Sequence, residues 1–175
     1  MNRRQLLTAA CCAAPSILFS TGNAQKKPPA DQFQGSPERR ESLRKTGDAI
    51  RSAFAKGDVE EILAYHHPEV VKALAYQNYI VGIKALKADL LSTFKSFKLE
   101  FLENTPETIL FHEGTAVEMS LFTIQSIPKA SGPPAIFKGR SMVVYIEYPA
   151  SPTGWASIRE TIQPESRTVS SSTNI

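Results

Sequence analysis

Residues 135–148 read AIFKGRSMVVYIEY and residues 155–163 read WASIRETIQ, with the break PASPTG between them. Two long β-rich runs joined by a short break that contains Pro and Gly predict a β-hairpin. We expect the rest of the chain to cover one face of this hairpin, and we expect the hairpin to form the wall of a pocket.

Helical patterns come before the hairpin. Ser36-Pro37-Glu38 is typical of a helix start, with a capping serine, a proline at the first helical position and an acid in the first turn. Gly57 ends this helix, and Asp58, with Glu61 three residues later, begins a short second one. Gly82 opens a third helix, whose apolar stripe consists of Ile83, Leu86, Leu90, Leu91, Phe94 and Phe97.

After the third helix the hydrophobic period changes to two. The strand candidates are Lys98–Asn104, Thr108–Glu113, Thr115–Ile127 and the two runs of the hairpin. Glu69–Ile80 is expected to be irregular or to contain short strands. Helices followed by strands predict an α+β domain, with a curved antiparallel sheet and helices on one of its faces.

The N-terminus predicts a signal peptide over residues 1–24. It has a basic start, an uncharged and mostly apolar run, and small residues before Gln25. Arg3-Arg4 resembles a twin-arginine signal, with an ordinary Sec signal as the alternative. The apolar run is too short for a comfortable membrane span, so we expect an exported protein, periplasmic or secreted, without stable membrane insertion after cleavage. Residues 25–36 predict a linker and residues 165–175 a flexible tail.

Charge and cysteine usage exclude several classes of function. The 175-residue chain has a formal net charge of +3, and loss of Arg3 and Arg4 leaves 18 basic against 17 acidic residues. No basic patch remains to indicate a nucleic-acid partner. Cys11 and Cys12 both lie in the predicted signal peptide, so the mature chain has no thiol for catalysis or metal binding. No P-loop, dinucleotide fingerprint or G-x-S-x-G motif is present, and we expect no metal and no cofactor.

Several short motifs occur in a particular order along the chain: Ala55-Lys56-Gly57-Asp58, His67-Pro68-Glu69-Val70-Val71, Gly82-Ile83, Gly139-Arg140 and Gly154-Trp155. Over about Pro37–Pro164, this order resembles the SnoaL-like branch of the nuclear transport factor 2 superfamily. The resemblance implies a cone of three helices on a curved sheet, with a pocket inside it and often a homodimer through the outer sheet face. The superfamily includes ketosteroid isomerase-like enzymes, dehydratases and polyketide cyclases, so fold alone does not decide function.

This chain departs from the cyclases of that branch. They use an Asp/His arrangement near the end of the sheet, whereas the last strand here, Ile158–Ile162, contains no histidine. A cyclase mechanism is therefore not carried over to this chain.

Side-chain parity in the final hairpin brings two charges together. Matching the apolar faces of its two strands sets Met142 opposite Glu160 and makes Arg140 a diagonal neighbour of Glu160. Because an unpaired buried charge costs several kcal/mol, the two residues form either a structural ion pair or a pocket floor that holds a polar or anionic ligand group. An adjacent arginine favours the ionised carboxylate, which suits recognition better than proton abstraction.

Four further residues are candidates for the site. Glu118 lies in the predicted strand Thr115–Ile127 and joins the pocket floor if its side of that strand faces inward. The residues on the other side of the strand are equally apolar, so either side is a candidate for the inner face. Tyr65 and Tyr79 flank the segment expected at the mouth of the cone, with core packing as the alternative for each. His67 is a candidate base. Its neighbour His66 points in another direction, so the two make no metal pair, and stabilisation of a helix C-terminus is the alternative.

Three hypotheses for function follow. The first is binding of a small, partly apolar molecule in the cone, without a metal or a nucleotide. The second is a cofactor-free isomerase or dehydratase that uses Glu160 or His67 as the base. The third is a dimerisation or interaction module that makes no use of the pocket.

Overall fold

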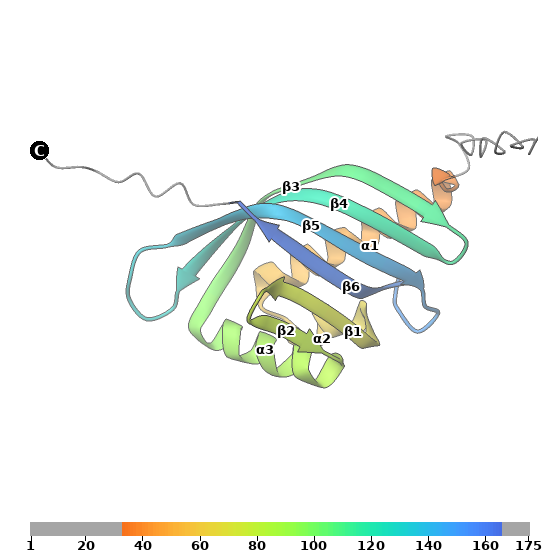
Figure 1. Ribbon diagram of the computed structural model, residues 1–175. Coiled ribbons are helices and arrows are strands. Elements are labelled where there is room, and N and C mark those ends of the chain that lie inside the picture. The colour runs from red at the N-terminus through yellow and green to blue at the C-terminus, as the bar shows by residue number, and fades with distance from the viewer. Residues whose placement is uncertain (1–32, 166–175) are drawn as a thin grey trace, which may run out of the picture.

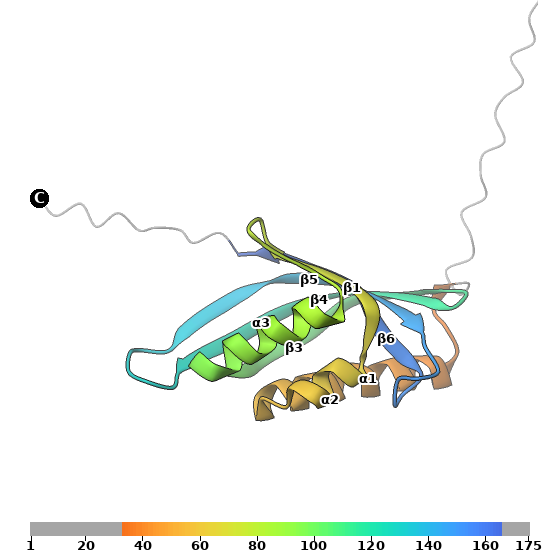
Figure 2. The ribbon, with the colours of Figure 1, turned by 90° about the horizontal axis from the view of Figure 1, so that it is seen from below.

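Three helices lie against one face of a bent, six-stranded sheet in the computed structural model, which describes residues 33–165 (Figure 1). Figure 2 shows all three helices on the same side of the sheet. The predicted signal peptide, most of the predicted linker and nearly all of the predicted tail lie outside the described residues. The elements are α1 Pro37–Lys56, α2 Val59–Ala64, β1 His66–Ala75, β2 Asn78–Val81, α3 Ile83–Ser96, β3 Phe97–His112, β4 Thr115–Pro128, β5 Ala135–Glu147 and β6 Trp155–Pro164.

The ends of the helices follow local chemistry. The Ser36 hydroxyl accepts a hydrogen bond from the backbone N–H of Arg39 at 3.3 Å, and Gly57 ends α1 in the left-handed conformation, with φ of 70°. The Asp58 carboxylate caps α2 by accepting from the N–H of Glu61 at 3.0 Å. These caps confirm the predicted helix boundaries. None of the helices in the described part is long and apolar enough to cross a membrane.

The strands are arranged in the order β2-β1-β6-β5-β4-β3, and all neighbours are antiparallel except β1 and β6, which are parallel. The predicted α+β class is confirmed. One strand prediction needs correction. Residues 97–112 form one strand instead of two, and it passes through Pro106 because β3 is an edge strand, where a missing N–H is tolerated. Of the two alternatives for residues 69–80, the strands are present, and they form the β1–β2 hairpin.

The predicted register of the β5–β6 hairpin is wrong by one residue. Glu160 lies opposite Val143, and Arg140 lies opposite Gln163. The strand β5 is apolar on both of its parities, so the sequence pattern did not identify the inner face, and the register also shifts between Val144 and Tyr145. Met142, which was expected to face inward, is 40% exposed on the outer face.

The buried apolar residues form two clusters. One lies between the helices and the β1–β2 hairpin and includes Ile62, Leu86 and Leu90. The other lies beneath the first half of α1 and consists of Leu43, Phe111, Ala116, Tyr145 and Trp155. Leu86 and Leu90 of the first cluster and Tyr145 of the second line one cavity, so the core is divided by an internal space.

Candidate functional site

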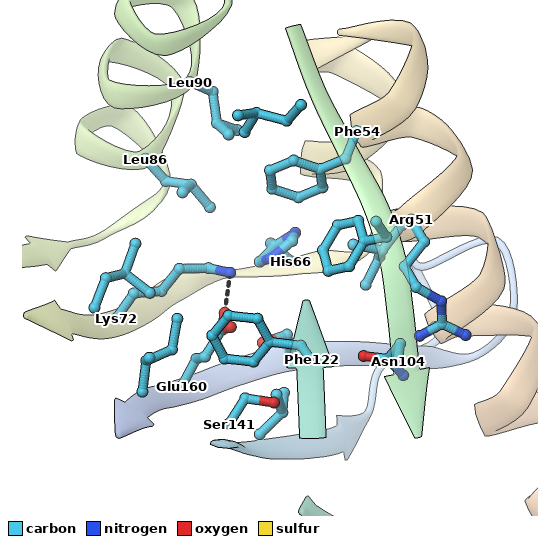
Figure 3. A pocket seen from close by; sticks show the side chains of 18 of the residues that line it. Arg51, Phe54, His66, Lys72, Leu86, Leu90, Asn104, Phe122, Ser141 and Glu160 are labelled. Atoms are coloured by element: carbon cyan, nitrogen blue, oxygen red, sulfur yellow. Dashed lines mark hydrogen bonds and ion pairs between the residues drawn. The ribbon is translucent and has the colours of Figure 1, made fainter. Parts of the chain in front are cut away.

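A cavity of about 250 Å³ lies between the helices and the concave face of the sheet (Figure 3). Side chains from α1, α3 and every strand of the sheet line it. Most of the wall is apolar and consists of Ile50, Phe54, Leu74, Leu86, Leu90, Leu99, Phe101, Phe122, Val143 and Ile162. A cavity of about 150 Å³ is large enough for benzene, so this one has room for a molecule of one or two rings.

The final hairpin forms one wall of the cavity, as expected. On β5 the inward residues are Ser141, Val143 and Tyr145, and on β6 Glu160 and Ile162 also line the cavity. On β5 the lining positions alternate with outward ones, because successive side chains of a strand point to opposite faces. On β6 Ser157 also lines the cavity, and the alternation is interrupted between Ser157 and Glu160, where the register shifts.

Lys72 and Glu160 form an ion pair on this concave face. They lie side by side on the parallel strands β1 and β6, and the ammonium group of Lys72 donates to Oε2 of Glu160 (dashed line in Figure 3). Their side chains are only 7% and 18% exposed. Each charge therefore compensates the other in a place where either alone would be costly to bury.

His66 begins β1 directly after α2 and is 4% exposed. Its Nδ1 donates to the carbonyl oxygen of Ile62 at 2.7 Å, since a carbonyl can only accept. Burial, followed by the nearby charge of Lys72, holds the pKa of His66 well below its usual range. The ring is therefore neutral, with its proton on Nδ1 and a lone pair on Nε2. Figure 3 shows the ring beside the end of the Lys72 side chain.

Tyr145 supplies a neutral hydroxyl to the same cavity. Burial raises the pKa of its phenol, and the carboxylates of Glu118 and Glu160 raise it further. The group therefore keeps its proton across the ordinary pH range and is available as a hydrogen-bond donor.

Two other polar atoms on the wall lack partners among residues 33–165. The Oγ atom of Ser157 and the Nδ2 atom of Asn104 are buried and make no hydrogen bond within the described residues. The carboxylate of Glu118 accepts from the Ser120 hydroxyl at 2.6 Å. Buried polar atoms are normally satisfied, so these unpartnered groups mark a place where another molecule could supply the missing bonds.

The structure brings two of the predicted site residues together on the cavity wall, Glu118 and Glu160. Arg140 is not with them, and its predicted proximity to Glu160 is wrong. Its side chain points to the outer face of the sheet, where Nη2 donates to Oε1 of Glu107 at 2.8 Å. This hydrogen bond lowers the pKa of Glu107. Arg140 therefore provides no positive floor for an anion inside the cone.

The other predicted residues lie outside the cavity. Tyr65 is buried at the end of α2, and Tyr79 is exposed on the edge strand β2. His67 packs edge-to-face on Tyr148, with ring centroids 5.0 Å apart, and its Nδ1 accepts from the N–H of Glu69 at 3.2 Å. The two histidines begin a strand instead of ending a helix, so alternation sends His66 inward and His67 outward.

Sequence reasoning missed three of the cavity residues: His66, Lys72 and Tyr145. One signal was available for the first two. In a strand over residues 66–75, His66, Val70 and Lys72 have the same parity, and a charge within such an apolar pattern is unusual. Short strands were only one of two alternatives for this segment, and no inward face was assigned to them.

The described residues contain no group of three or more His, Cys, Asp or Glu that could hold a metal ion.

Comparison with solved structures identifies the fold. A candidate scytalone dehydratase from Novosphingobium aromaticivorans superposes with a TM-score of 0.67 at 15% identity, over 73% of this chain and 85% of that one. A nuclear transport factor 2-like superfamily protein from Salmonella enterica superposes with a TM-score of 0.62 at 15% identity, over 77% and 96%. A ketosteroid isomerase-like protein from Erwinia carotovora superposes with a TM-score of 0.58 at 17% identity, over 75% of this chain and 99% of that one.

These identities are low, so the likeness concerns the fold alone. No family model matches the chain, and no curated protein matches it in sequence. The helices packed on one face of a curved, open, mostly antiparallel sheet agree with those structures, and the chain has the nuclear transport factor 2-like fold.

Proposed function

We propose that the cavity binds a small, partly apolar molecule. The observation that carries this proposal is the unpartnered hydroxyl of Ser157, which is 2% exposed on the wall of a 250 Å³ cavity. An apolar body fits against Phe54, Leu86 and Leu90, and a polar group on the ligand satisfies the hydroxyls of the sheet. The volume limits the ligand to one or two rings.

Filling the cavity tests this proposal. Leu86→Trp on α3 places a large side chain in the cavity, whereas Leu91→Trp alters a residue of the same helix that is 54% exposed. Calorimetric titration with 2-naphthol is expected to give one site per chain in the wild type and in Leu91→Trp, and no binding in Leu86→Trp. Ile162→Phe on β6 is a milder filling variant in case Leu86→Trp folds poorly. No binding by the wild type, or equal binding by all four proteins, rejects the proposal.

A second candidate function is a cofactor-free isomerase or dehydratase, and the lone pair of His66 favours it. A neutral imidazole in an apolar cavity can take a proton from carbon next to a ligand carbonyl, and the Tyr145 hydroxyl can donate to the oxygen on which charge develops. Of the two bases expected earlier, Glu160 lines the cavity but is held in its pair with Lys72, and His67 lies outside.

Exchange of the α-protons of 2-tetralone in D₂O, followed by proton NMR, tests this second candidate. The wild type should accelerate exchange, and His66→Asn should lose about 10²-fold or more of the rate, because general base catalysis contributes on that order. Asparagine can still donate to the Ile62 carbonyl oxygen, so the fold is expected to survive. His67→Asn is the matched control and should keep the full rate. Equal rates in all three proteins remove His66 from the chemistry.

A homodimer through the outer sheet face is also proposed. That face exposes Leu110, Leu121 and Met142, which lie on the adjacent strands β3, β4 and β5. Burying such side chains favours association. Sedimentation analysis is expected to show a dimer for the wild type and a monomer for Met142→Glu. If the wild type is a monomer at every concentration, the proposed homodimer is rejected.

Two expectations from the sequence stay proposals: membership of the SnoaL-like branch and export through the twin-arginine or the Sec route. Replacing Arg3-Arg4 by Lys-Lys should block the twin-arginine route and should leave a Sec signal working. Immunodetection in periplasmic and cytoplasmic fractions distinguishes the two routes.

A further inference from the structure

The charges that face the cavity are not balanced. Lys72 is paired with Glu160, and Nη2 of Arg51 lies 2.7 Å from Oδ1 of Asp48. Glu118 and Asp89 also line the cavity, but neither forms an ion pair with a Lys, Arg or His of residues 33–165. Two carboxylates of the site therefore have no cation of their own in the described chain, Glu118 on the sheet and Asp89 on α3.

The surroundings of Glu118 are poor in donors. Its neighbours on the adjoining strands are Ile109 of β3 and Val143 of β5, both apolar. The only hydrogen bond that its side chain makes in the described part is the one from Ser120, at 2.6 Å to Oε1. A carboxylate has capacity for about four hydrogen bonds, so Glu118 has room for a donor that comes from a ligand.

Neutral polar groups line the cavity on β5, β6 and β1. Ser157 of β6 and Tyr145 of β5 are register partners, and His66 of β1 is the register partner of Ser157 on the other side. The hydroxyl of Ser157 has no partner within the described protein. These uncharged groups suit an uncharged polar group on a ligand, since they can exchange neutral hydrogen bonds with it and cannot neutralise a charge.

We propose that Glu118 determines the specificity of the cavity: it selects an uncharged ligand with a hydroxyl donor, such as a phenol or an alicyclic alcohol, and excludes carboxylates. This inference rests on the proposed binding function. A hydroxyl that donates to a carboxylate in an apolar surrounding makes a strong, charge-assisted hydrogen bond. A second carboxylate at the same place meets repulsion that the low-dielectric wall screens poorly.

Three probes with one ring system test the inference by calorimetric titration at neutral pH. 2-Naphthol carries the hydroxyl donor, 2-methoxynaphthalene lacks it, and 2-naphthoate replaces it by an anion. For the wild type we expect 2-naphthol to bind most tightly. The ether is expected to bind about tenfold more weakly, as for one lost hydrogen bond to a charged group. The naphthoate is expected to bind more weakly still.

A substitution then assigns the effect to one residue. Glu118→Gln removes the charge, keeps the shape and can still accept from Ser120. It should tighten naphthoate binding relative to 2-naphthol by about tenfold. Glu107→Gln is the matched control, because it removes a carboxylate from the outer face of the same sheet. It should leave the ratio between the two ligands unchanged.

The outcomes separate the inference from the function on which it rests. Binding of naphthoate as tightly as 2-naphthol by the wild type overturns the specificity and leaves ligand binding intact. An unchanged ratio in folded Glu118→Gln overturns the assignment to Glu118. If no probe binds the wild type, the binding function itself fails, and the inference fails with it. The ratios in the wild type need no variant, so a folding defect in Glu118→Gln still leaves a decisive comparison.

Discussion

Two ion pairs on opposite faces of one sheet show how differently the same chemistry acts in two environments. Lys72–Glu160 lies on the concave face, with side chains 7% and 18% exposed. Arg140–Glu107 lies on the outer face, with side chains 39% and 31% exposed. The inner pair joins the adjacent strands β1 and β6, and the outer pair reaches from β5 to β3 across β4. Both pairs bring a cation to a carboxylate on one face of the sheet, and they differ in burial.

The comparison shows which pair the fold depends on. Water screens the outer charges, and such pairs contribute about 0–1 kcal/mol. In the cavity wall neither charge is well solvated, so each requires the other. The inner pair also lies where a ligand would be held. Of the outer pair, Arg140 was assigned to the site by parity alone, and it lies away from the cavity.

Removing the cation of the inner pair should have the largest effect. Lys72→Met keeps most of the apolar side chain and leaves the Glu160 carboxylate without its partner. The free energy of unfolding should fall by about 3 kcal/mol, as measured by urea denaturation. A loss below about 1 kcal/mol would show that the cavity hydrates Glu160 as well as the surface does.

The double variant Lys72→Met/Glu160→Leu is the control for that measurement. It removes both charges and should return the free energy of unfolding to within about 1 kcal/mol of the wild type. If the double variant is as unstable as Lys72→Met, packing around Lys72, and not the stranded charge, explains the loss.

Acid should weaken the buried region next. His66 is neutral in the folded protein because its pKa is held well below the usual value, whereas in the unfolded chain it takes a proton below about pH 6.5. The unfolded state then binds more protons, so stability falls as pH falls, by up to about 1.4 kcal/mol per pH unit. His66→Asn should lack this contribution. Denaturation curves between pH 5 and 7 measure the difference, and parallel pH profiles for the two proteins contradict it.

The outer pair should give the smallest effect. Arg140→Met is expected to change the free energy of unfolding by less than about 1 kcal/mol and to leave 2-naphthol binding unchanged, since Arg140 lies away from the cavity. Calorimetry and urea denaturation of the one variant measure both quantities. A tenfold loss of 2-naphthol affinity would place Arg140 back in the site.

The candidate site was only partly predictable. Glu160 and Glu118 were named from the sequence and line the cavity. The partner of Glu160 was not named, because Lys72 lies in a segment for which the sequence left an irregular chain and short strands as alternatives. Arg140 was named because Met142 and its alternate neighbours looked like an inner face. Those residues lie on the outer face of the sheet, which is also apolar. The alternation of side chains along a strand cannot tell which of two apolar faces is the inner one.

The sequence by itself determined the helix ends and the order of elements. A cap such as Ser36 or Asp58 acts on a backbone N–H three residues away, so its information is local. The tertiary structure decided which face of β5 lines the cavity, that Lys72 meets Glu160 across 88 residues of sequence, and that His66 is neutral. Those outcomes depend on strand register, on the parallel contact of β1 with β6, and on burial. None of these is encoded within a few residues of the groups concerned.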